Sequence, residues 1–412
     1  MPPYYTRAVQ TPRKAALAFI FVAMVLDIIA FGIVIPVLPT LIESFVSGDT
    51  ARAAQYFGLF GTVWALMQFI CSPILGALSD RFGRRPVLLL SITGLGLDYI
   101  FMALAPSLAW LFVGRIISGM TAAGFGTAAA YIADVTPPEK RAAAYGLVGA
   151  AFGFGFIIGP ALGGILGATD PRLPFWVAGG LALVNALYGF FVLPESLPED
   201  RRAPFLWSKA NPIGALRFLR SHGELFSLAS VSFLYNLGHQ VFPSVFVLWA
   251  SLVLRWDPKQ VGMALAVVGV FSVIVQGGLV RPLVKRIGQR RTLLVGGFFG
   301  TLGFAMYGLA GTVPMFWFAA IAYAPAGVFN PTLLGLLSKR VGPSEQGKLQ
   351  GANASLSGIG GMLGPGLFAL SFSWAIRPEA TLHIPGLPFL LAAALFALAA
   401  VIGWRATRND LL

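Results

Sequence analysis

Three charged residues lie inside long apolar runs of the chain: Asp27, Asp98 and Arg115. A charge within a hydrocarbon layer is costly, so each of the three is a functional candidate by default. A carboxylate in a low-dielectric site binds its proton more tightly, and a nearby cation opposes that effect. Arg115 stays charged at any relevant pH and is a natural counter-ion. We predict that the three residues couple protons to a conformational change. The alternative is that the aspartates only bond one helix to another.

A second charged group lies in the polar segment between two apolar runs at residues 76–86, which reads GALSDRFGRRP. Gly83 permits a tight turn there. Asp80 is placed to meet the positive N-terminal end of a later helix, near Gln346, when one side of the protein is closed. Arg81 or Arg84 can reach an acid at the end of another run. We predict a conformational latch made of Asp80, Arg81, Gly83, Arg84 and Asp134. The alternative is that the positive charge only sets orientation.

A degraded copy of this segment, VKRIGQRR at residues 284–291, recurs in the second half of the chain. Gly83 and Gly288 are 205 positions apart, and so are Pro160 and Pro365. Two landmarks at one offset predict two homologous halves around a central site. The same offset finds no acid at the positions that match Asp27, Asp80, Asp98 and Asp134, where the second half has Ser232, Lys285, Gly303 and Lys339. Coupling residues are therefore expected in the first half.

The elements that must position these residues are long apolar helices. The chain is 57% hydrophobic and only 11% charged. Runs of about 20 apolar residues can cross a ~30 Å hydrocarbon core as helices. Because the runs are continuous rather than alternating, a β-barrel is not expected. Twelve transmembrane helices are predicted, at 15–39, 55–78, 86–105, 109–133, 142–167, 174–193, 225–252, 260–281, 292–311, 313–338, 348–373 and 386–404. The predicted fold is all-α, with two pseudo-symmetric six-helix bundles.

The predicted domains are a first bundle at 1–194, a cytoplasmic linker at 195–224 and a second bundle at 225–412. If both termini are cytoplasmic, most of the 29 Lys and Arg residues fall on the cytoplasmic side, as the positive-inside rule requires. The net charge of +13 therefore indicates topology, and nucleic-acid binding is not expected. We expect a multi-pass membrane protein, and the family resemblance described below implies the bacterial cytoplasmic (inner) membrane. A monomer suffices because one chain supplies both halves.

Two homologous halves around a central site are typical of a transporter. Such a transporter binds its substrate near the midplane of the membrane, between the halves. Side chains predicted to bind it are Gln68, Tyr99, Asn236, His239, Gln240, Phe242, Gln276, Asn330 and Asn353. Asn236, His239 and Gln240 have a spacing that puts them on one helix face. His239 titrates near neutral pH and is a hypothetical substitute for the missing acid of the second half. The alternative for each polar residue is a hydrogen bond between helices.

Several motifs together resemble the major facilitator superfamily, in particular its twelve-helix drug:proton antiporters. Residues 76–86 are similar to the loop signature of that family, and RIISG at 115–119 resembles its helix 4 signature. GFIIGPALGG at 155–164 resembles the antiporter signature of helix 5, with Gly155, Gly159, Pro160, Gly163 and Gly164 at its key positions. These small residues serve tight packing, a hinge, or both.

The tetracycline/proton antiporters of that superfamily offer a closer resemblance. Leu26-Asp27, the run at 80–91 and Leu97-Asp98-Tyr99 are similar to their sequences. The resemblance implies the major facilitator fold and proton-coupled efflux of tetracycline-like drugs by alternating access. It also implies coupling roles for Asp98 and Asp27 and an essential loop role for Arg84. No cofactor is expected beyond the proton gradient and a divalent cation carried by the drug itself.

Two alternative functions are a proton-driven exporter of another antibiotic, sugar or metabolite, and a membrane sensor that does not transport. The first gains weight because the positions that match the family's helix 9 acid and helix 8 histidine are Thr301 and Ser272. An enzyme is not expected. The chain has too few His, Cys and acidic residues for a metal site and no phosphate-binding loop.

Overall fold

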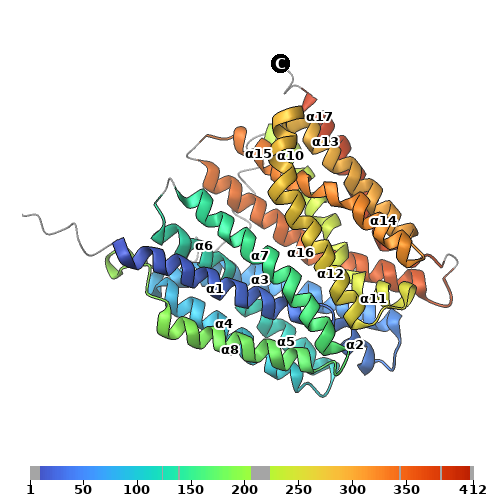
Figure 1. Cartoon of the computed structure of the whole chain (residues 1–412), viewed down its shortest axis with the longest axis horizontal. Coiled ribbons are helices and arrows are strands. Elements are labelled where there is room, and N and C mark those ends of the chain that lie inside the picture. Colours follow the sequence, from blue (N-terminus) through green and yellow to red (C-terminus); the bar gives the residue numbers. More distant parts are fainter. Residues whose placement is uncertain are drawn as a thin grey trace, which may run out of the picture.

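The structure is a computed structural model that describes residues 10–122, 124–137, 140–205, 223–342, 345–380 and 383–408. Its regular elements are helices (Figure 1). Those of the first half are α1 (Gln10–Val34), α2 (Leu38–Phe45), α3 (Thr50–Phe82), α4 (Arg84–Ala103), α5 (Leu108–Thr121), α6 (Gly124–Val135), α7 (Arg141–Gly167), α8 (Leu173–Val192) and η2 (Glu199–Arg201). Those of the second half are α10 (Gly223–His239), α11 (Val241–Leu254), α12 (Pro258–Ile274), η3 (Val275–Leu279), α13 (Val280–Leu309), α14 (Val313–Tyr323), η4 (Ala324–Val328), α15 (Phe329–Lys339), α16 (Gln346–Ile376) and α17 (Leu387–Ala406).

Among the described residues, 11 helical stretches are long and apolar enough to cross a membrane. The stretch Pro258–Leu309 has 52 residues and would be about 78 Å long as one helix, more than twice a hydrocarbon core. Its backbone leaves helical geometry at Gly288, with φ 80° and ψ 164°. The stretch is therefore two crossings joined by a turn. The all-α fold is confirmed, and the twelve predicted spans each correspond to a helical crossing.

Several crossings are interrupted by prolines. Pro243 has no N–H and its ring conflicts with the carbonyl of His239, so α10 ends at His239 and α11 begins at Val241. A similar interruption separates α1 from α2 around Pro36.

Polar side chains cap the start of other helices. The Asp49 carboxylate accepts the Arg52 N–H at 3.0 Å at the start of α3, and Asp257 and Gln260 form a capping box at the start of α12.

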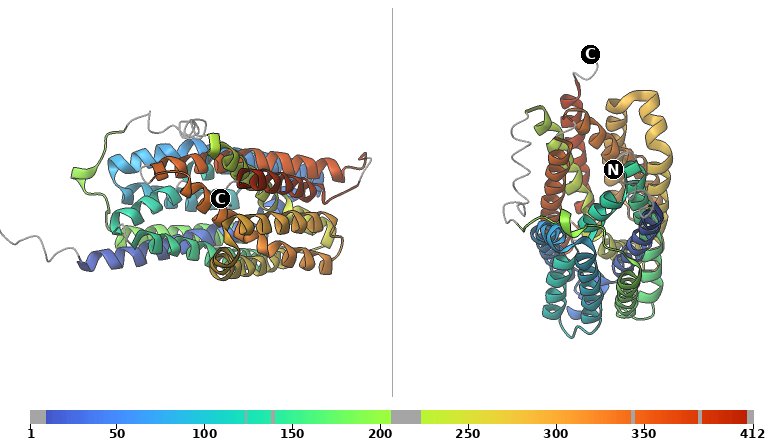
Figure 2. Two further views of the ribbon diagram at one scale, coloured as in Figure 1. Left: turned by 90° about the horizontal axis from the view of Figure 1, so that it is seen from above. Right: turned by 90° about the vertical axis from the view of Figure 1, so that its left-hand side faces the viewer.

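Helices α1–α8 form one group and α10–α17 form a second (Figure 2). The most extensive contacts between the groups join α3 to α16 and α7 to α12. We call the face that carries the turns at Gly83 and Gly288 the inner face, and the opposite face the outer face. Residues 195–205 of the predicted linker also lie at the inner face, where the Ala203 N–H donates to the Asp80 carbonyl at 3.0 Å. Residues 206–222 of that linker lie outside the described part of the chain.

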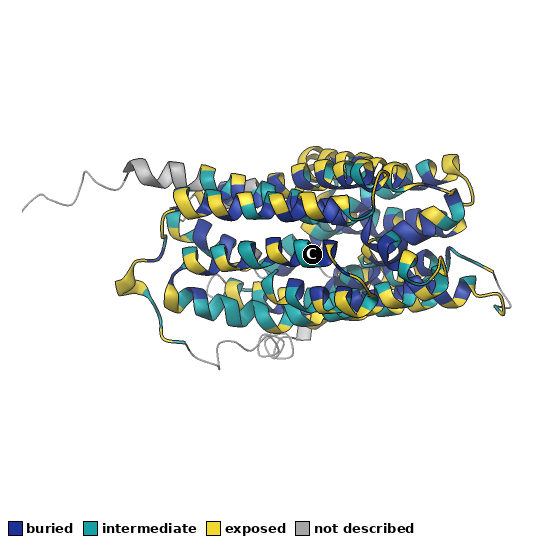
Figure 3. Cartoon of the chain, turned by 90° about the horizontal axis from the view of Figure 1, so that it is seen from below, coloured by how far each residue is buried: buried dark blue, intermediate teal, exposed yellow. Residues whose placement is uncertain are grey.

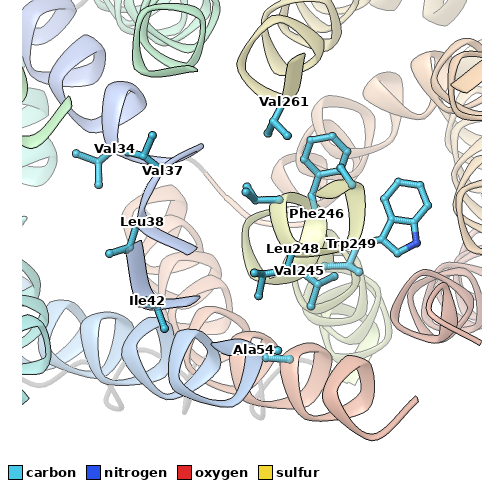
Figure 4. Close-up of a cluster of buried hydrophobic side chains, with 14 of the residues drawn as sticks. Val34, Val37, Leu38, Ile42, Ala54, Val245, Phe246, Leu248, Trp249 and Val261 are labelled. Atoms are coloured by element: carbon cyan, nitrogen blue, oxygen red, sulfur yellow. The ribbon is translucent and has the colours of Figure 1, made fainter. Parts of the chain in front are cut away.

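The hydrophobic core near the outer face is continuous across both groups. Val34, Leu38 and Ile42 of the first half belong to the same cluster as Val245 and Phe246 of the second half (Figure 4). Toward the inner face each group has a core of its own. One contains Met24, Leu88, Tyr131 and Leu193, and the other contains Leu225, Leu293 and Leu337. The two halves are thus sealed together at the outer face and separate toward the inner face.

Many exposed positions lie on the outside of the helices (Figure 3), and large apolar residues occupy many of them. Phe191 is 75% exposed, Phe318 is 65% exposed and Phe298 is 62% exposed. Such extensive apolar exposure is unusual for a protein in water and is expected where lipid tails contact the helices.

Candidate functional site

A cavity of about 740 Å³ lies between the two groups of helices. Its apolar wall is mainly aromatic, with Phe31, Phe57, Phe60, Trp64, Phe69 and Phe156. Its polar side chains include Gln68, Tyr99, Arg115, Ser118 and Gln240. Pockets of this size, mostly apolar with a few convergent polar groups, are typical of sites for drug-sized molecules. The lining residues of α16 reach Gly351, close to its inner end, so the cavity extends inward from the outer seal.

Arg115 of α5 is the charged residue that lines this cavity in the described part of the chain. Its Nη2 lies 4.0 Å from Asp98 Oδ2 of α4, and the Asp98 side chain has no exposed surface. Arg115 Nη2 also lies 3.2 Å from Met102 Sδ and 3.5 Å from Ser118 Oγ. Neither Asp98 carboxylate oxygen nor Arg115 Nε has a hydrogen-bond partner among the described residues. A buried ion pair with so few hydrogen bonds is poorly compensated, which suits groups that exchange partners during function.

Asp27 and Tyr99 extend this charged region toward α1. Tyr99 lines the cavity beside Asp98 and is close enough to interact electrostatically with Asp27, Arg115 and Asp98. The Tyr99 hydroxyl and Asp27 Oδ1 are both buried without a hydrogen-bond partner in the described residues. The structure therefore pairs Asp98 with Arg115 beside Tyr99 and places Asp27 within electrostatic range of Tyr99. Their role in coupling stays a prediction.

Of the nine residues predicted to bind substrate, the structure places Gln68, Tyr99 and Gln240 in the cavity lining. Gln68 Nε2 lies 3.5 Å from the Ala122 carbonyl, at the limit of a hydrogen bond. Asn236 and Asn353 instead connect α10 to α16. The Ser357 hydroxyl donates to Asn236 Oδ1 at 2.6 Å, and the Ser232 hydroxyl donates to Asn353 Oδ1 at 2.5 Å. In this conformation these two amides have the helix-bonding role that was the alternative.

His239 and Phe242 belong to an aromatic cluster inside the second half. The Phe242 ring contacts the rings of Phe246, Phe304, Tyr307, Tyr323 and Phe389, and His239 lies among Tyr235, Phe242 and Tyr323. Gln276 lies in the π-helical segment η3, where its Nε2 donates to Ser272 Oγ at 2.9 Å. Asn330 lies in α15. None of these four residues is among those that line the cavity.

The aromatic wall of α3 was not predicted, although its signal is present in the sequence. Phe57, Gly61, Trp64 and Gln68 are three or four residues apart and share one face of α3, which is the face that lines the cavity. In a membrane helix, aromatic residues also occur on the face toward lipid. Spacing alone therefore does not show which face meets the partner bundle.

The predicted latch is centred on Arg84. Arg84 Nε lies 3.1 Å from Asp134 Oδ2, and Arg84 Nη1 lies 2.5 Å from Asp80 Oδ1. Gly83 has φ +104°, which only glycine adopts without strain. Arg81 has no acidic partner among the described residues, and its guanidinium lies over the Phe82 ring at 5.1 Å. The structure thus joins Asp80, Arg84 and Asp134 within the first half.

Glu195 is a further member of this inner-face group that the sequence did not reveal. Its carboxylate accepts the backbone N–H groups of Arg84 at 2.9 Å and of Arg85 at 3.2 Å, at the positive end of α4. The predicted meeting of Asp80 with the start of α16 is not made in this conformation. Gln346, at the start of α16, accepts instead from the Ser338 hydroxyl at 3.0 Å.

The small residues of α7 allow close approach to helices on two sides. A methyl group at Gly159 would lie 2.7 Å from Gly32 Cα of α1, and one at Gly163 would lie 2.7 Å from the carbonyl carbon of Ile33. Gly155 faces Ile28 of the same helix, whereas Gly164 faces Pro258 and Gly262 of α12. Pro160 lies inside α7 and its carbonyl abuts Gly262. Tight packing is therefore observed, and a hinge role stays a prediction.

Comparison with known proteins now decides the family. The sequence model of the Major Facilitator Superfamily matches residues 20–365. The chain belongs to the major facilitator superfamily. This is a superfamily of transporters rather than enzymes, so the chain is a multi-pass membrane transporter for small molecules.

Relatives within the superfamily confirm the resemblance drawn from the motifs. The chain is 37% identical to the class C tetracycline resistance protein of Escherichia coli, over 92% of this chain and 94% of that protein. It is 34% identical to the class H tetracycline resistance protein of Pasteurella multocida, over 93% of this chain and 94% of that one.

Solved structures give the same fold. The structure is similar to that of the human organic anion transporter MFSD10, with a TM-score of 0.71 and 25% identity over 96% of this chain and all of that one. It is also similar to the nucleoside transporter NupG, with a TM-score of 0.79 and 13% identity over 95% of this chain and 99% of that one. The second likeness concerns the fold alone.

Proposed function

We propose that this transporter exports tetracycline-like drugs across the bacterial cytoplasmic membrane in exchange for protons, with both termini in the cytoplasm. The observation that carries the proposal is the aromatic cavity with Arg115 at its wall and the covered Asp98 behind Arg115, closed at the outer face and extending toward the inner face. The tetracycline resistance proteins that the chain resembles support the choice of drug.

In this proposal the flat rings of the drug lie against the aromatic wall of α3, and Gln68, Tyr99 and Gln240 supply hydrogen bonds. Asp98 carries the proton, because its environment changes when the cavity opens to the other side. Rocking of the halves would open the seal at Leu38 and Phe246 and bring Asp80 to the start of α16. The proton gradient supplies the energy. A divalent cation enters only as part of a chelated drug.

A second candidate is export of an anionic amphiphile. The specific observation in its favour is that Arg115 is the charged residue lining the cavity in the described chain, while the adjacent Asp98 side chain is fully covered. The likeness to the human organic anion transporter also supports it.

Expression in a pump-deficient bacterium, with a panel of antibiotics, tests the proposal. We expect the intact chain to raise resistance to tetracycline and the Asp98→Asn variant to lose it. In everted vesicles, tetracycline should release protons from energised vesicles that contain the intact chain. Resistance to none of the antibiotics, with no proton release on adding tetracycline, would refute the proposal. Resistance only to anionic drugs would favour the second candidate.

A further inference from the structure

The inner face of the second half carries a group of cations that have no acidic partner among the described residues. We call this group the inner basic patch; it consists of Arg281, Lys285, Arg286, Arg290, Arg291 and Lys339. No ion pair or side-chain hydrogen bond joins any of them to another described residue. Arg290 Nε is buried and still lacks a hydrogen-bond partner in the described chain. Among the described residues, nothing offsets the charge of this patch.

The matching loop of the first half shows what the patch has lost. There Arg84 contacts both Asp80 and Asp134, and Glu195 covers the start of α4. At the offset of 205 positions, Asp80 and Asp134 become Lys285 and Lys339, and Arg84 becomes Gln289. Gln289 still lies against the matching helix, with its Nε2 3.0 Å from where a methyl group at Gly335 of α15 would sit. The geometry of the loop is thus retained while its acids are replaced by cations.

The position of the inner basic patch sets the kind of anion that can reach it. Arg281, Lys285, Arg286, Arg291 and Lys339 are exposed. The first four flank the turn at Gly288, where the chain leaves one membrane crossing and enters the next. The lipid-facing Leu279 and Phe298 lie on the two sides of this turn. The cations are therefore at the level of lipid headgroups, and long Lys and Arg side chains readily extend to that level.

We propose that the headgroup phosphates of anionic phospholipids dock on the inner basic patch and replace the carboxylates that this loop lacks at Lys285 and Lys339. Clusters of Lys and Arg next to a membrane crossing attract anionic lipid through the negative surface potential of the leaflet. Orientation by positive charge alone would not account for the difference between the two loops, since the first loop follows the same charge rule and neutralises Arg84 internally.

Native mass spectrometry of the full-length chain in detergent tests this proposal. Phosphatidylglycerol and phosphatidylcholine are added in equal amounts, and the lipids retained by the protein are counted. We expect the wild type to retain at least about fivefold more phosphatidylglycerol than phosphatidylcholine. The Lys285→Asp/Lys339→Asp variant places acids at the positions that match Asp80 and Asp134 and should show nearly equal retention. Lys259→Asp/Arg377→Asp makes the same charge change at the outer face and should keep the preference.

Two further measurements keep the test decisive. If the double aspartate variant is not monodisperse, Lys285→Gln/Lys339→Gln replaces it and should lower the phosphatidylglycerol preference in the same direction. Thermal unfolding compares phosphatidylglycerol with inorganic phosphate, and only the lipid should stabilise the wild type. Equal retention of both lipids by the wild type overturns the proposal. So does an unchanged preference in the inner-face variants, or equal stabilisation by inorganic phosphate. Neither readout depends on transport.

Discussion

The Arg115 guanidinium has several N–H donors, yet its contacts in the described chain are a methionine sulfur, a distant serine hydroxyl and the Asp98 carboxylate at 4.0 Å. A close guanidinium–carboxylate pair has N···O distances nearer 2.8 Å. Arg115 and Asp98 are therefore close enough to attract each other but do not form a close, hydrogen-bonded ion pair. Protonation of Asp98 weakens its attraction to Arg115 but breaks no short hydrogen bond to a described residue, because neither of its oxygens accepts one.

From this geometry we predict that Asp98→Asn separates drug binding from proton movement. The amide keeps the shape of the side chain but cannot release a proton, so drug-induced proton release from everted vesicles should fall at least about tenfold. Binding of tetracycline to the purified variant should change far less. Asp200→Asn, in the exposed segment η2, is the control and should behave as the wild type. Normal proton release by Asp98→Asn would place the coupling elsewhere.

The Glu195 carboxylate covers the positive end of α4 by accepting two backbone N–H groups, and this contact can be tested. Glu195→Gln removes the charge and should cost about 1 kcal/mol of stability, comparable to the loss of a helix cap. We expect the midpoint of thermal unfolding in detergent to fall by about 2 °C. Glu199→Gln is the control, since Glu199 is an exposed residue with one long contact to Arg202 and should leave the midpoint unchanged. An equally large fall of the unfolding midpoint in the Glu199→Gln control would show that Glu195 does not cap α4.

At the scale of elements, the approach of α7 to α1 depends on the absence of side chains. A methyl group at Gly163 would meet the backbone of Ile33, which cannot move aside as a flexible side chain could. Gly163→Ala should therefore destabilise the first half by about 1–3 kcal/mol, as overpacking does. Gly180→Ala is the matched control, because Gly180 of α8 is exposed and has open space around it. The stability of both variants is measured by thermal unfolding and by the amount of folded protein in the membrane. Equal stability of the two variants would show that α7 can shift away from α1.

The existence of the helices could be predicted because crossing a bilayer requires long apolar runs, and these are visible in composition alone. Their interruptions were not predicted. The π-helical segment η3 lies where Val275 packs against Gly327 of η4, so it depends on a tertiary contact. The break at Gln240 follows from Pro243, a local signal that was available. Local backbone chemistry thus predicts some kinks, whereas packing between distant segments determines others.

The charged part of the site could also be predicted, because intramembrane acids are rare and each must have a reason. The polar part was predicted less well. Asn236 and Gln240 both face α16, but only Gln240 lines the cavity, whereas the Asn236 amide oxygen accepts a hydrogen bond from the Ser357 hydroxyl. A polar side chain in an apolar helix can bond a neighbouring helix or face a cavity, and its sequence environment is the same in either case.

At the scale of the whole molecule, the distribution of the cores defines the conformation. One cluster joins both halves near the outer face, and two separate clusters lie toward the inner face. In Figure 1 the α2 and α11 ends of the two groups lie next to each other, while the start of α1 and the end of α17 point apart. The latch agrees with this arrangement, since Asp80 pairs with Arg84 and not with the start of α16. The conformation is therefore the one in which the cavity extends toward the inner face and is closed at the outer face.

This conformation predicts one-sided access to the cavity. In a Cys71→Ser background, Ala354→Cys places a thiol on an exposed, cavity-lining position of α16, whereas Val245→Cys places one inside the outer seal. Without drug or a proton gradient, a membrane-impermeant maleimide should label Ala354→Cys in everted vesicles and leave it unlabelled in right-side-out vesicles. Val245→Cys should resist labelling in both. A proton gradient with drug present populates the opposite conformation, so labelling of Ala354→Cys should slow while that of Val245→Cys appears in right-side-out vesicles. Labelling of Ala354→Cys from the outer side at rest would mean that the seal of Leu38 and Phe246 does not close the resting protein, and that the two halves separate at the face where their cores are joined here.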